Sequence, residues 1–227
     1  MQIVILDDGD FPTASYPLSI LVKADKIICC DGSVLKLLKY NSKLVPNYIV
    51  GDMDSLPQQY KEKYKEIIYS SSCQETNDQT KAFSFALGLV PQGKNANIHI
   101  LGATGLREDH TLGNLSLLME YAVCGNYIEP FKNLMHSGVT VDIITNYGIF
   151  SPHFNTFTAK CAKGQQISIF SFDQLLKIKS AGLLYPTDNV IFDLWWKATL
   201  NECTGSKYTL EFSHPAKVLL FENYKQI

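Results

Sequence analysis

The alternation of strand-like and helix-like runs in the first 137 residues constrains the fold more than any other feature. Five short apolar runs occur there, namely QIVIL, KIICC, NYIVG, EIIYS and ANIHIL. Runs with helical spacing of apolar residues lie between them, such as TNDQTKAFSFALGLV and DHTLGNLSLLMEYA. Strands separated by helices predict βαβ units, and therefore an α/β domain with a largely parallel sheet.

The pattern changes after about Ser137. Strand-like runs follow one another with glycine, proline and asparagine between them: GVTVDIITNYGIFS, GQQISIFSF, NVIFDLWW, KYTLEFS and KVLLFEN. The segment FDQLLKIKSAG is ambiguous, and we expect no long helix here. The pattern predicts an all-β domain, a sandwich or a flattened barrel, over residues 138–227, with the boundary between His136 and Gly138.

Charge and hydropathy exclude some classes of function. The net charge is only −2, so there is no global basic field to hold nucleic acid or an anionic membrane. No apolar run approaches the roughly 20 residues that cross a bilayer. The start, MQIVILDDGD, reads as a strand and a turn rather than a signal peptide, and the six cysteines contain no C-x-x-C pair. We therefore expect a cytoplasmic protein with free thiols.

Acidic residues follow two of the predicted strands. Asp31 comes after KIICC, and Asp52 and Asp54 come after NYIVG. Ligands of open parallel sheets bind at the carboxyl ends of the strands. If the chain is still extended there, Asp52 and Asp54 point to the same side and suit Mg²⁺, with Gly51 allowing close approach of the backbone. The alternative is a solvated acidic turn closed by Ser55.

A third acidic position opens a predicted helix. In QETNDQTKAF, Thr76 and Gln79 fit a capping box with Thr76 as the N-cap, which places Asp78 in the first turn. Asp78 there complements the helix dipole, and it is also available as a further metal ligand. Lys81, one turn later, either reaches a phosphate or is simply solvated.

A glycine-containing loop follows the fifth strand. In ILGATGLREDHTLGNL, Gly102 and Gly105 precede a helix that we expect to begin near Asp109 or Thr111. Glycines before a helix expose backbone N–H groups, which favours anion binding, although no standard nucleotide fingerprint is met.

The same loop carries Arg107, the only arginine among the 20 basic residues. Arginine binds phosphate oxygens in a bidentate manner, which lysine cannot do. Asp109 and His110 either cap the helix or orient phosphates and substrate. An acidic metal site, an arginine loop and a parallel sheet form the set that phosphoryl-type transfer from a nucleoside triphosphate needs.

The order of these motifs resembles the thiamin pyrophosphokinase family. The matching segments are CCDGSVLKLL, VGDMDS, QETNDQTKA and GATGLREDHTLGN, followed by SAGLLYPTDN and TLNEC in the β-rich part. The resemblance covers nearly the whole chain. It implies a Rossmann-like ATP- and Mg²⁺-binding catalytic domain over residues 1–137 and a thiamin-binding, dimerising β-sandwich over residues 138–227.

The resemblance also implies an activity and a site. The activity is transfer of the β,γ-pyrophosphoryl group of ATP to the hydroxyl of thiamin, which gives thiamin diphosphate and AMP. Mg²⁺ would be held by Asp52, Asp54 and Asp78, and thiamin would bind between the α/β domain of one subunit and the β domain of the other in a homodimer. Residues matching Asp31, Gln74, Arg107, Asp109 and Asn114 would line the nucleotide and transfer site. From the motifs themselves, we add Asn77, Lys81, Gly102, Gly105 and His110 to the predicted nucleotide-binding positions.

The C-terminal part departs more from the family than the N-terminal part does. Leu200-Asn201 stands where the family often has serine before asparagine, and Tyr185 matches a family aromatic. We expect Tyr185, Trp196 and Asn201 to bind thiamin, with an aromatic face attracting the cationic thiazolium; the alternative for these aromatics is a place in the core or dimer interface. Two other functions remain open, a pyrophosphokinase for another alcohol and a non-catalytic nucleotide or thiamin diphosphate sensor.

Overall fold

The computed structural model describes residues 1–71, 75–121 and 138–224. The chain divides into two compact units, and the change from the first to the second lies between Asn146 and Tyr147; a short piece that begins at Leu118 groups with the second unit. Most of the predicted boundary, His136 to Gly138, lies outside the described residues, which resume at Gly138. The strand that follows it, β6 (Val139–Ile144), groups with the first unit rather than with the β-rich part.

The first unit alternates strands and helices. Its strands are β1 (Gln2–Leu6), β2 (Lys26–Cys30), β3 (Tyr48–Gly51), β4 (Ile68–Ser70), β5 (Ala96–Leu101) and β6 (Val139–Ile144). Its helices are α1 (Ser15–Val22), α2 (Ser33–Tyr40), α3 (Gln58–Lys63), a 3-10 turn (Lys65–Ile67), α4 (Asp78–Leu89) and α5 (Glu108–Tyr121). The short helices α1 and α3 are not expected from the sequence, whereas α4 and α5 are.

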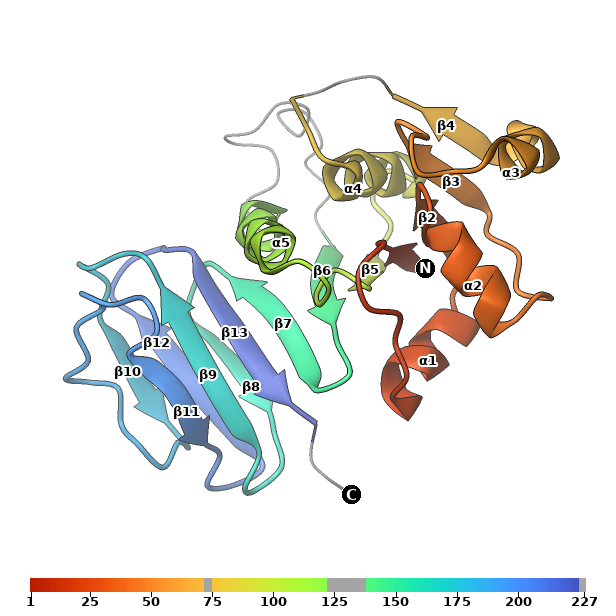
Figure 1. Cartoon of the computed structure of the whole chain (residues 1–227). Helices are drawn as coiled ribbons and strands as arrows, with labels where there is room; N and C mark the ends of the chain where they lie inside the picture. Colours follow the sequence, from red (N-terminus) through yellow and green to blue (C-terminus); the bar gives the residue numbers. More distant parts are fainter. Residues whose placement is uncertain (72–74, 122–137, 225–227) are drawn as a thin grey trace. The chain divides into compact units, whose positions relative to one another are not determined.

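The sheet of this unit is parallel, as predicted. Its strands lie in the order β6-β5-β1-β2-β3-β4, and every adjacent pair among them runs in the same direction (Figure 1). β1 lies between β2 and β5, so the order of the strands reverses beside β1. In open α/β sheets such a switch point is where ligands bind, at the carboxyl ends of the strands.

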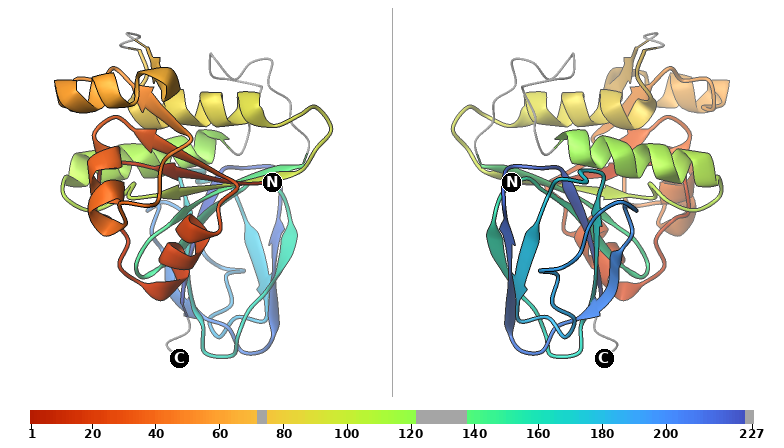
Figure 2. Two further views of the ribbon diagram at one scale, coloured as in Figure 1. Left: turned by 90° about the vertical axis from the view of Figure 1, so that its right-hand side faces the viewer. Right: turned by 90° about the vertical axis from the view of Figure 1, so that its left-hand side faces the viewer.

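Helices cover both faces of this sheet, which explains its continuous apolar strands. In β1 and β2 every residue after the first is buried, as is typical of a strand covered on both sides. α4 packs against β1, β2 and β3, and Figures 1 and 2 show α1 and α2 on the opposite face from α4. The strands are added outward from β1 to β4, and the chain then returns to place β5 on the other side of β1. Because the crossovers are right-handed, the helices of these two runs lie on opposite faces of the sheet.

The second unit is an antiparallel sandwich, as predicted. Its strands are β7 (Gly148–His153), β8 (Phe157–Lys160), β9 (Gln166–Ser171), β10 (Ile178–Ala181), β11 (Ala198–Glu202), β12 (Lys207–Phe212) and β13 (Val218–Asn223). One sheet has the order β11-β9-β13-β7 and the other β10-β12-β8. Residues from both sheets, such as Ile169, Leu220 and Tyr208, share one buried core.

One predicted strand of this unit is wrong. The apolar run NVIFDLWW forms turns instead of a strand. Its Phe192 is buried, whereas Ile191, Leu194 and both tryptophans are exposed. The prediction fails because this run is hydrophobic but lacks the period-2 alternation of a half-buried strand.

Among the described residues, no helix has the length and apolar character needed to cross a membrane.

Candidate active site

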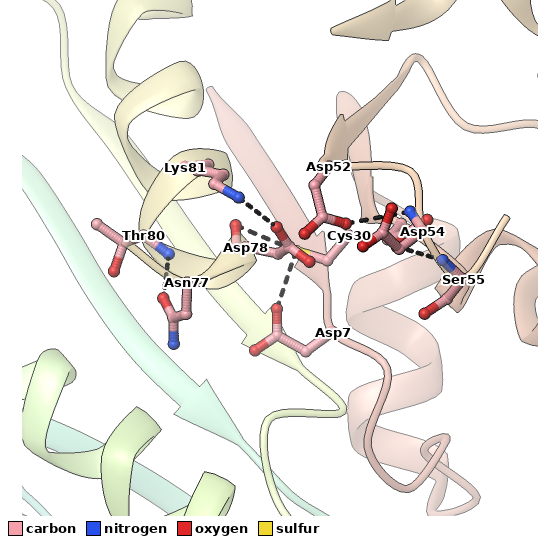
Figure 3. A network of polar contacts seen from close by, with 10 residues as sticks. Asp7, Cys30, Asp52, Asp54, Ser55, Asn77, Asp78, Thr80 and Lys81 are labelled. Atoms are coloured by element: carbon pink, nitrogen blue, oxygen red, sulfur yellow. Dashed lines mark hydrogen bonds and ion pairs between the residues drawn. The ribbon is translucent and has the colours of Figure 1, made fainter. Parts of the chain in front are cut away.

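Three carboxylates from separate segments meet at the carboxyl edge of the parallel sheet. Asp31 follows β2, Asp52 follows β3, and Asp78 is the first residue of α4. One oxygen of each lies within 4.8 Å of an oxygen of the other two, and Figure 3 shows Asp52 and Asp78 close together. Carboxylates at this spacing repel one another, so the group favours either a bound cation or protonation of one member.

Asp31 is held in place by hydrogen bonds of its backbone N–H and of one carboxylate oxygen. Its φ angle of 41° lies in the left-handed region, which aspartate tolerates better than most residues. Its N–H donates to the carbonyl of Val50 at 3.1 Å, and its Oδ2 accepts from the N–H of Ser55 at 2.9 Å. Its Oδ1 is buried and has no hydrogen-bond partner in the described part of the chain. Burial raises the pKa of Asp31, the Ser55 hydrogen bond opposes this, and Asp78 adds to it.

Gly51 allows two of the acids to approach the end of β3. A β-carbon at this position would lie 3.2 Å from Cβ of Asp31 and 3.2 Å from Cγ of Asp78. Both distances are tighter than ordinary van der Waals contact. The absence of a side chain at Gly51 therefore makes room for the carboxylates themselves.

Asp54 lies outside the group of three. The extended conformation that would align it with Asp52 ends at Met53, whose φ is 68°. Asp54 is exposed, and its N–H donates to Oδ1 of Asp52 at 3.1 Å. The structure thus gathers Asp31, Asp52 and Asp78, where the sequence predicts Asp52, Asp54 and Asp78.

Lys81 forms an ion pair with Asp78 rather than extending into solvent. Its Nζ lies 3.0 Å from Oδ1 of Asp78, and the lysine side chain is only 7% exposed. Figure 3 shows this contact one turn into α4. The cation offsets part of the negative charge and fixes the orientation of Asp78.

The predicted N-cap of α4, Thr76, is wrong by one residue. Asn77 is the N-cap, and its side chain accepts a hydrogen bond from the N–H of Thr80 at 2.9 Å. Its amide also donates to Oδ1 of Asn114 in α5 at 3.3 Å. Asn114 in turn donates to the carbonyl of Ala103 at 2.8 Å. These bonds link the start of α4 to the loop after β5.

The glycines of that loop serve loop packing. Gly102 has a φ of 70°, and a β-carbon on it would lie 2.6 Å from the carbonyl oxygen of Asp7. A β-carbon on Gly105 would overlap the carboxylate of Asp10. The N–H of Gly9 donates to the carbonyl of Gly102 at 2.8 Å. The two glycines therefore let the loops after β1 and β5 cross in close contact.

Arg107 and Asp109 form an exposed pair at the start of α5. Nε of Arg107 donates to Oδ1 of Asp109 at 3.1 Å, and a second guanidinium nitrogen bonds Oδ2. The hydrogen bond from Arg107 lowers the pKa of Asp109 to about 2. His110 is exposed beside them, and its N–H donates to Oδ1 of Asp109 at 2.9 Å.

A pocket of about 340 Å³ opens between these segments. It lies at the switch point, because the ends of β1, β2 and β5 all contribute to it. It is lined by Asp7, Asp8, Gly9, Cys30, Asp31, Ser55, Asn77, Asp78, Gln79, Gly102, Ala103, Gly105, Leu106, Arg107, His110 and Asn114. Most of the predicted nucleotide-site residues in the described part of the chain thus line one acidic pocket, together with Arg107.

The sequence prediction missed Asp7. This residue follows β1 directly, is 7% exposed and lines the pocket. Burial raises the pKa of Asp7 to about 7, a hydrogen bond from Cys30 lowers it, and Asp78 and Asp8 raise it. The rule that identified Asp31 and Asp52, an acid directly after a buried strand, would have identified Asp7 in QIVILDD.

The remaining predicted positions divide into two groups. Gln74 lies outside the described residues. In the second unit, Tyr185 and Trp196 are 62% and 51% exposed. Asn201 is buried, and its side chain accepts from the N–H of Tyr185 at 3.1 Å and donates to the carbonyl of Tyr185 at 2.7 Å. Asn201 therefore holds the backbone of Tyr185, and the two aromatic faces are open.

Fold and site together define an α/β protein with an acidic pocket at a sheet switch point, followed by an antiparallel sandwich. Residues 18–128 match the family model described as thiamin pyrophosphokinase, catalytic domain, and residues 148–221 match that described as thiamin pyrophosphokinase, substrate-binding domain. The chain belongs to the thiamin pyrophosphokinase family.

Individual relatives agree with this assignment. Thiamin pyrophosphokinase 1 of Caenorhabditis elegans is 30% identical over 195 residues, which cover 84% of this chain and 76% of that protein. Thiamine pyrophosphokinase 1 of Oryza sativa subsp. japonica is 39% identical over 114 residues, which cover 42% of this chain and 43% of the rice protein. The chain thus spans less than half the length of the rice relative that it matches.

The fold also matches solved structures. Thiamin pyrophosphokinase from Candida albicans aligns with a TM-score of 0.77 at 19% identity, covering 99% of this chain and 90% of that one.

Proposed function

We propose that this protein transfers the β,γ-pyrophosphoryl group of ATP to the hydroxyl of thiamin. A bond forms between the hydroxyl oxygen and the β-phosphorus, and the bond from the β-phosphorus to the oxygen that stays on AMP breaks. The hydroxyl proton is released, and the products are thiamin diphosphate and AMP. The observation that supports this best is the approach of three carboxylates to within 4.8 Å in a member of this family.

Mg²⁺ fits the acidic group. The ligands on offer are hard carboxylate oxygens, which Mg²⁺ prefers, and Oδ1 of Asp31 is buried without a partner in the described part of the chain. Asp31, Asp52 and Asp78 would hold the ion, which when bound would neutralise charge on the triphosphate oxygens. A ligand role for Asp54, which the resemblance implies, stays a prediction.

Arg107 would bind phosphate oxygens at the other side of the pocket. Its guanidinium is exposed, and Asp109 orients it through two hydrogen bonds. A fixed guanidinium directed at phosphate stabilises charge that develops during transfer. Lys81 acts through Asp78, since it is buried against that carboxylate.

The second unit would supply the thiamin contacts. Tyr185 and Trp196 expose aromatic faces that suit a cationic thiazolium, at about 1–2 kcal/mol for a desolvated contact. Asn201 fixes the backbone of Tyr185 from both sides. We include in the proposal a homodimer, in which the α/β unit of one subunit and the β unit of the other hold thiamin, and a cytoplasmic location.

The products of a single incubation test this function. The protein is mixed with ATP, Mg²⁺ and thiamin, and the products are identified by mass spectrometry. Thiamin diphosphate and AMP in equal amounts support the proposal. ADP would indicate an ordinary kinase, AMP formed only with another alcohol would indicate a different acceptor, and tight ligand binding without turnover would indicate a sensor.

A further inference from the structure

Asp7 lies in the acidic pocket but has no part in the function proposed above. It is the residue directly after β1, at the switch point between β2 and β5. It lines the same pocket as Asp31 and Asp78 and is only 7% exposed. Burial of a carboxylate costs free energy unless the group has partners, so the contacts of Asp7 need to be accounted for.

The described part of the chain does not satisfy this carboxylate. Oδ1 accepts a hydrogen bond from the thiol of Cys30 at 3.0 Å, and Oδ2 is buried with no partner among the described residues. By contrast, two neighbouring acids each have a lysine partner: Lys36 pairs with Asp8 at 2.7 Å, and Lys81 pairs with Asp78 at 3.0 Å. A buried carboxylate oxygen without a partner carries a desolvation cost, which a bound cation would offset.

Asp7 faces Asp78 rather than the whole group of three acids. The three oxygens that lie within 4.8 Å of one another belong to Asp31, Asp52 and Asp78. Figure 3 shows the Asp7 carboxylate directed toward Cys30 and Asp78, and the charge of Asp78 acts on Asp7. Asp78 thus lies between two acidic positions, one on the β2–β3 side and one on the β1 side.

We propose that Asp7 and Asp78 form a second divalent-cation subsite, beside the subsite of Asp31, Asp52 and Asp78. The inference rests on the proposed acidic cation site and extends it. One or two carboxylates are the usual protein contribution to a Mg²⁺ site, whose other positions are filled by water and phosphate oxygens. Two ions about 3.5–4 Å apart are a known arrangement for holding the reacting oxygens of a phosphoryl group.

Counting bound ions tests the subsite. Mn²⁺ binding to the full chain is measured by electron paramagnetic resonance with a non-hydrolysable ATP analogue present. We expect two ions per chain in the wild type and one in Asp7→Asn, whose remaining site keeps its affinity within about threefold. The matched control, Asp8→Asn, changes the neighbouring carboxylate and should still bind two ions.

Thermal unfolding separates a ligand role from a structural one. Without a divalent cation, Asp7→Asn should be at least as stable as the wild type, because the change removes a negative charge near Asp78 and keeps an acceptor for Cys30. With saturating Mn²⁺ and analogue, the wild type should gain more in Tm than the variant. A structural role would instead lower Tm equally in both conditions.

Two results would overturn the subsite: one ion or none per chain in the wild type, or two ions in Asp7→Asn. Failure of the proposed function has a different signature. A protein that binds two ions and forms no thiamin diphosphate would remove the function and leave the subsite standing.

Discussion

Gly51 occupies the point where a single added carbon would meet two of the three carboxylates. The site depends on atoms at this scale: the left-handed backbone of Asp31, the missing side chain of Gly51 and the ion pair of Lys81 with Asp78. None of these is readable from the sequence, because each depends on which segments the fold brings together. What the sequence does indicate is residue type, acids after buried strands and a lone arginine after a glycine.

Gly51→Ala should separate the acids. The new methyl group would lie 3.2 Å from Asp31 and Asp78, so these side chains must move apart. We expect Mn²⁺ affinity to fall at least tenfold and the free energy of unfolding to fall by about 1–3 kcal/mol, measured by ion titration and urea unfolding.

Gly88 provides the control for this substitution. It lies in α4, is exposed, and has no atom within 4 Å of an added β-carbon among the described residues. Gly88→Ala should raise stability by up to about 1 kcal/mol and leave ion binding unchanged. Equal ion affinity in Gly51→Ala and the wild type would contradict our account of the site.

Arg107→Lys should reduce turnover while leaving stability intact. Lysine keeps the charge but loses the planar fork that binds two phosphate oxygens. We expect kcat/KM for ATP to fall at least tenfold, with Tm within about 1 °C because the side chain is exposed. Wild-type kinetics in this variant would remove Arg107 from the transfer site.

At the scale of elements, strand ends and helix starts bring the site residues together. The sequence predicts the parallel strands, α4 and α5 correctly because their apolar periodicity is strong. It fails for the exposed run NVIFDLWW and does not predict α1 or α3, where local pattern is weak. Asp7 is absent from the predicted site although the rule for strand ends applies to it. The N-cap prediction fails at Thr76 because a capping-box match does not show which residue is the last one outside the helix.

The cap of α4 can be tested directly. Asn77→Ala removes the bond to the N–H of Thr80 and the link to Asn114. It should lower the free energy of unfolding by about 1 kcal/mol and raise KM for ATP, since Asp78 begins this helix. Thr76→Ala, measured beside it by the same urea titration, should have less than half that effect; the reverse order would support the capping box.

At the scale of the whole molecule, the chain folds into two compact units. The sequence has alternating strand and helix patterns followed by a series of strand patterns. This order predicts an α/β unit and a β-sandwich, and both are present. The exact division cannot be read from the sequence, since β6 resembles the sandwich strands in composition and only its parallel pairing with β5 places it in the first unit.

The stability of the second unit should fall in mild acid. His153 stacks on Phe157, with ring centroids 3.8 Å apart, and burial lowers the pKa of His153 from 6.5 to about 4. Between these values the unfolded chain binds a proton that the folded chain does not, so stability decreases as pH falls. The decrease from this group is at most about 3 kcal/mol.

Urea unfolding of His153→Gln from pH 7 to pH 4 measures this contribution. The variant should be less stable than the wild type at pH 7, and its stability should decline less steeply as pH falls. Parallel pH profiles for the two proteins would show that His153 is not held neutral by burial.

Anomalous diffraction from crystals soaked with Mn²⁺ and a non-hydrolysable ATP analogue tests the central claim most directly. Our account predicts a manganese peak at about 2.0–2.3 Å from one oxygen each of Asp31, Asp52 and Asp78, with phosphate oxygens completing its coordination. Three carboxylates without manganese among them, while the analogue is bound elsewhere, would contradict it.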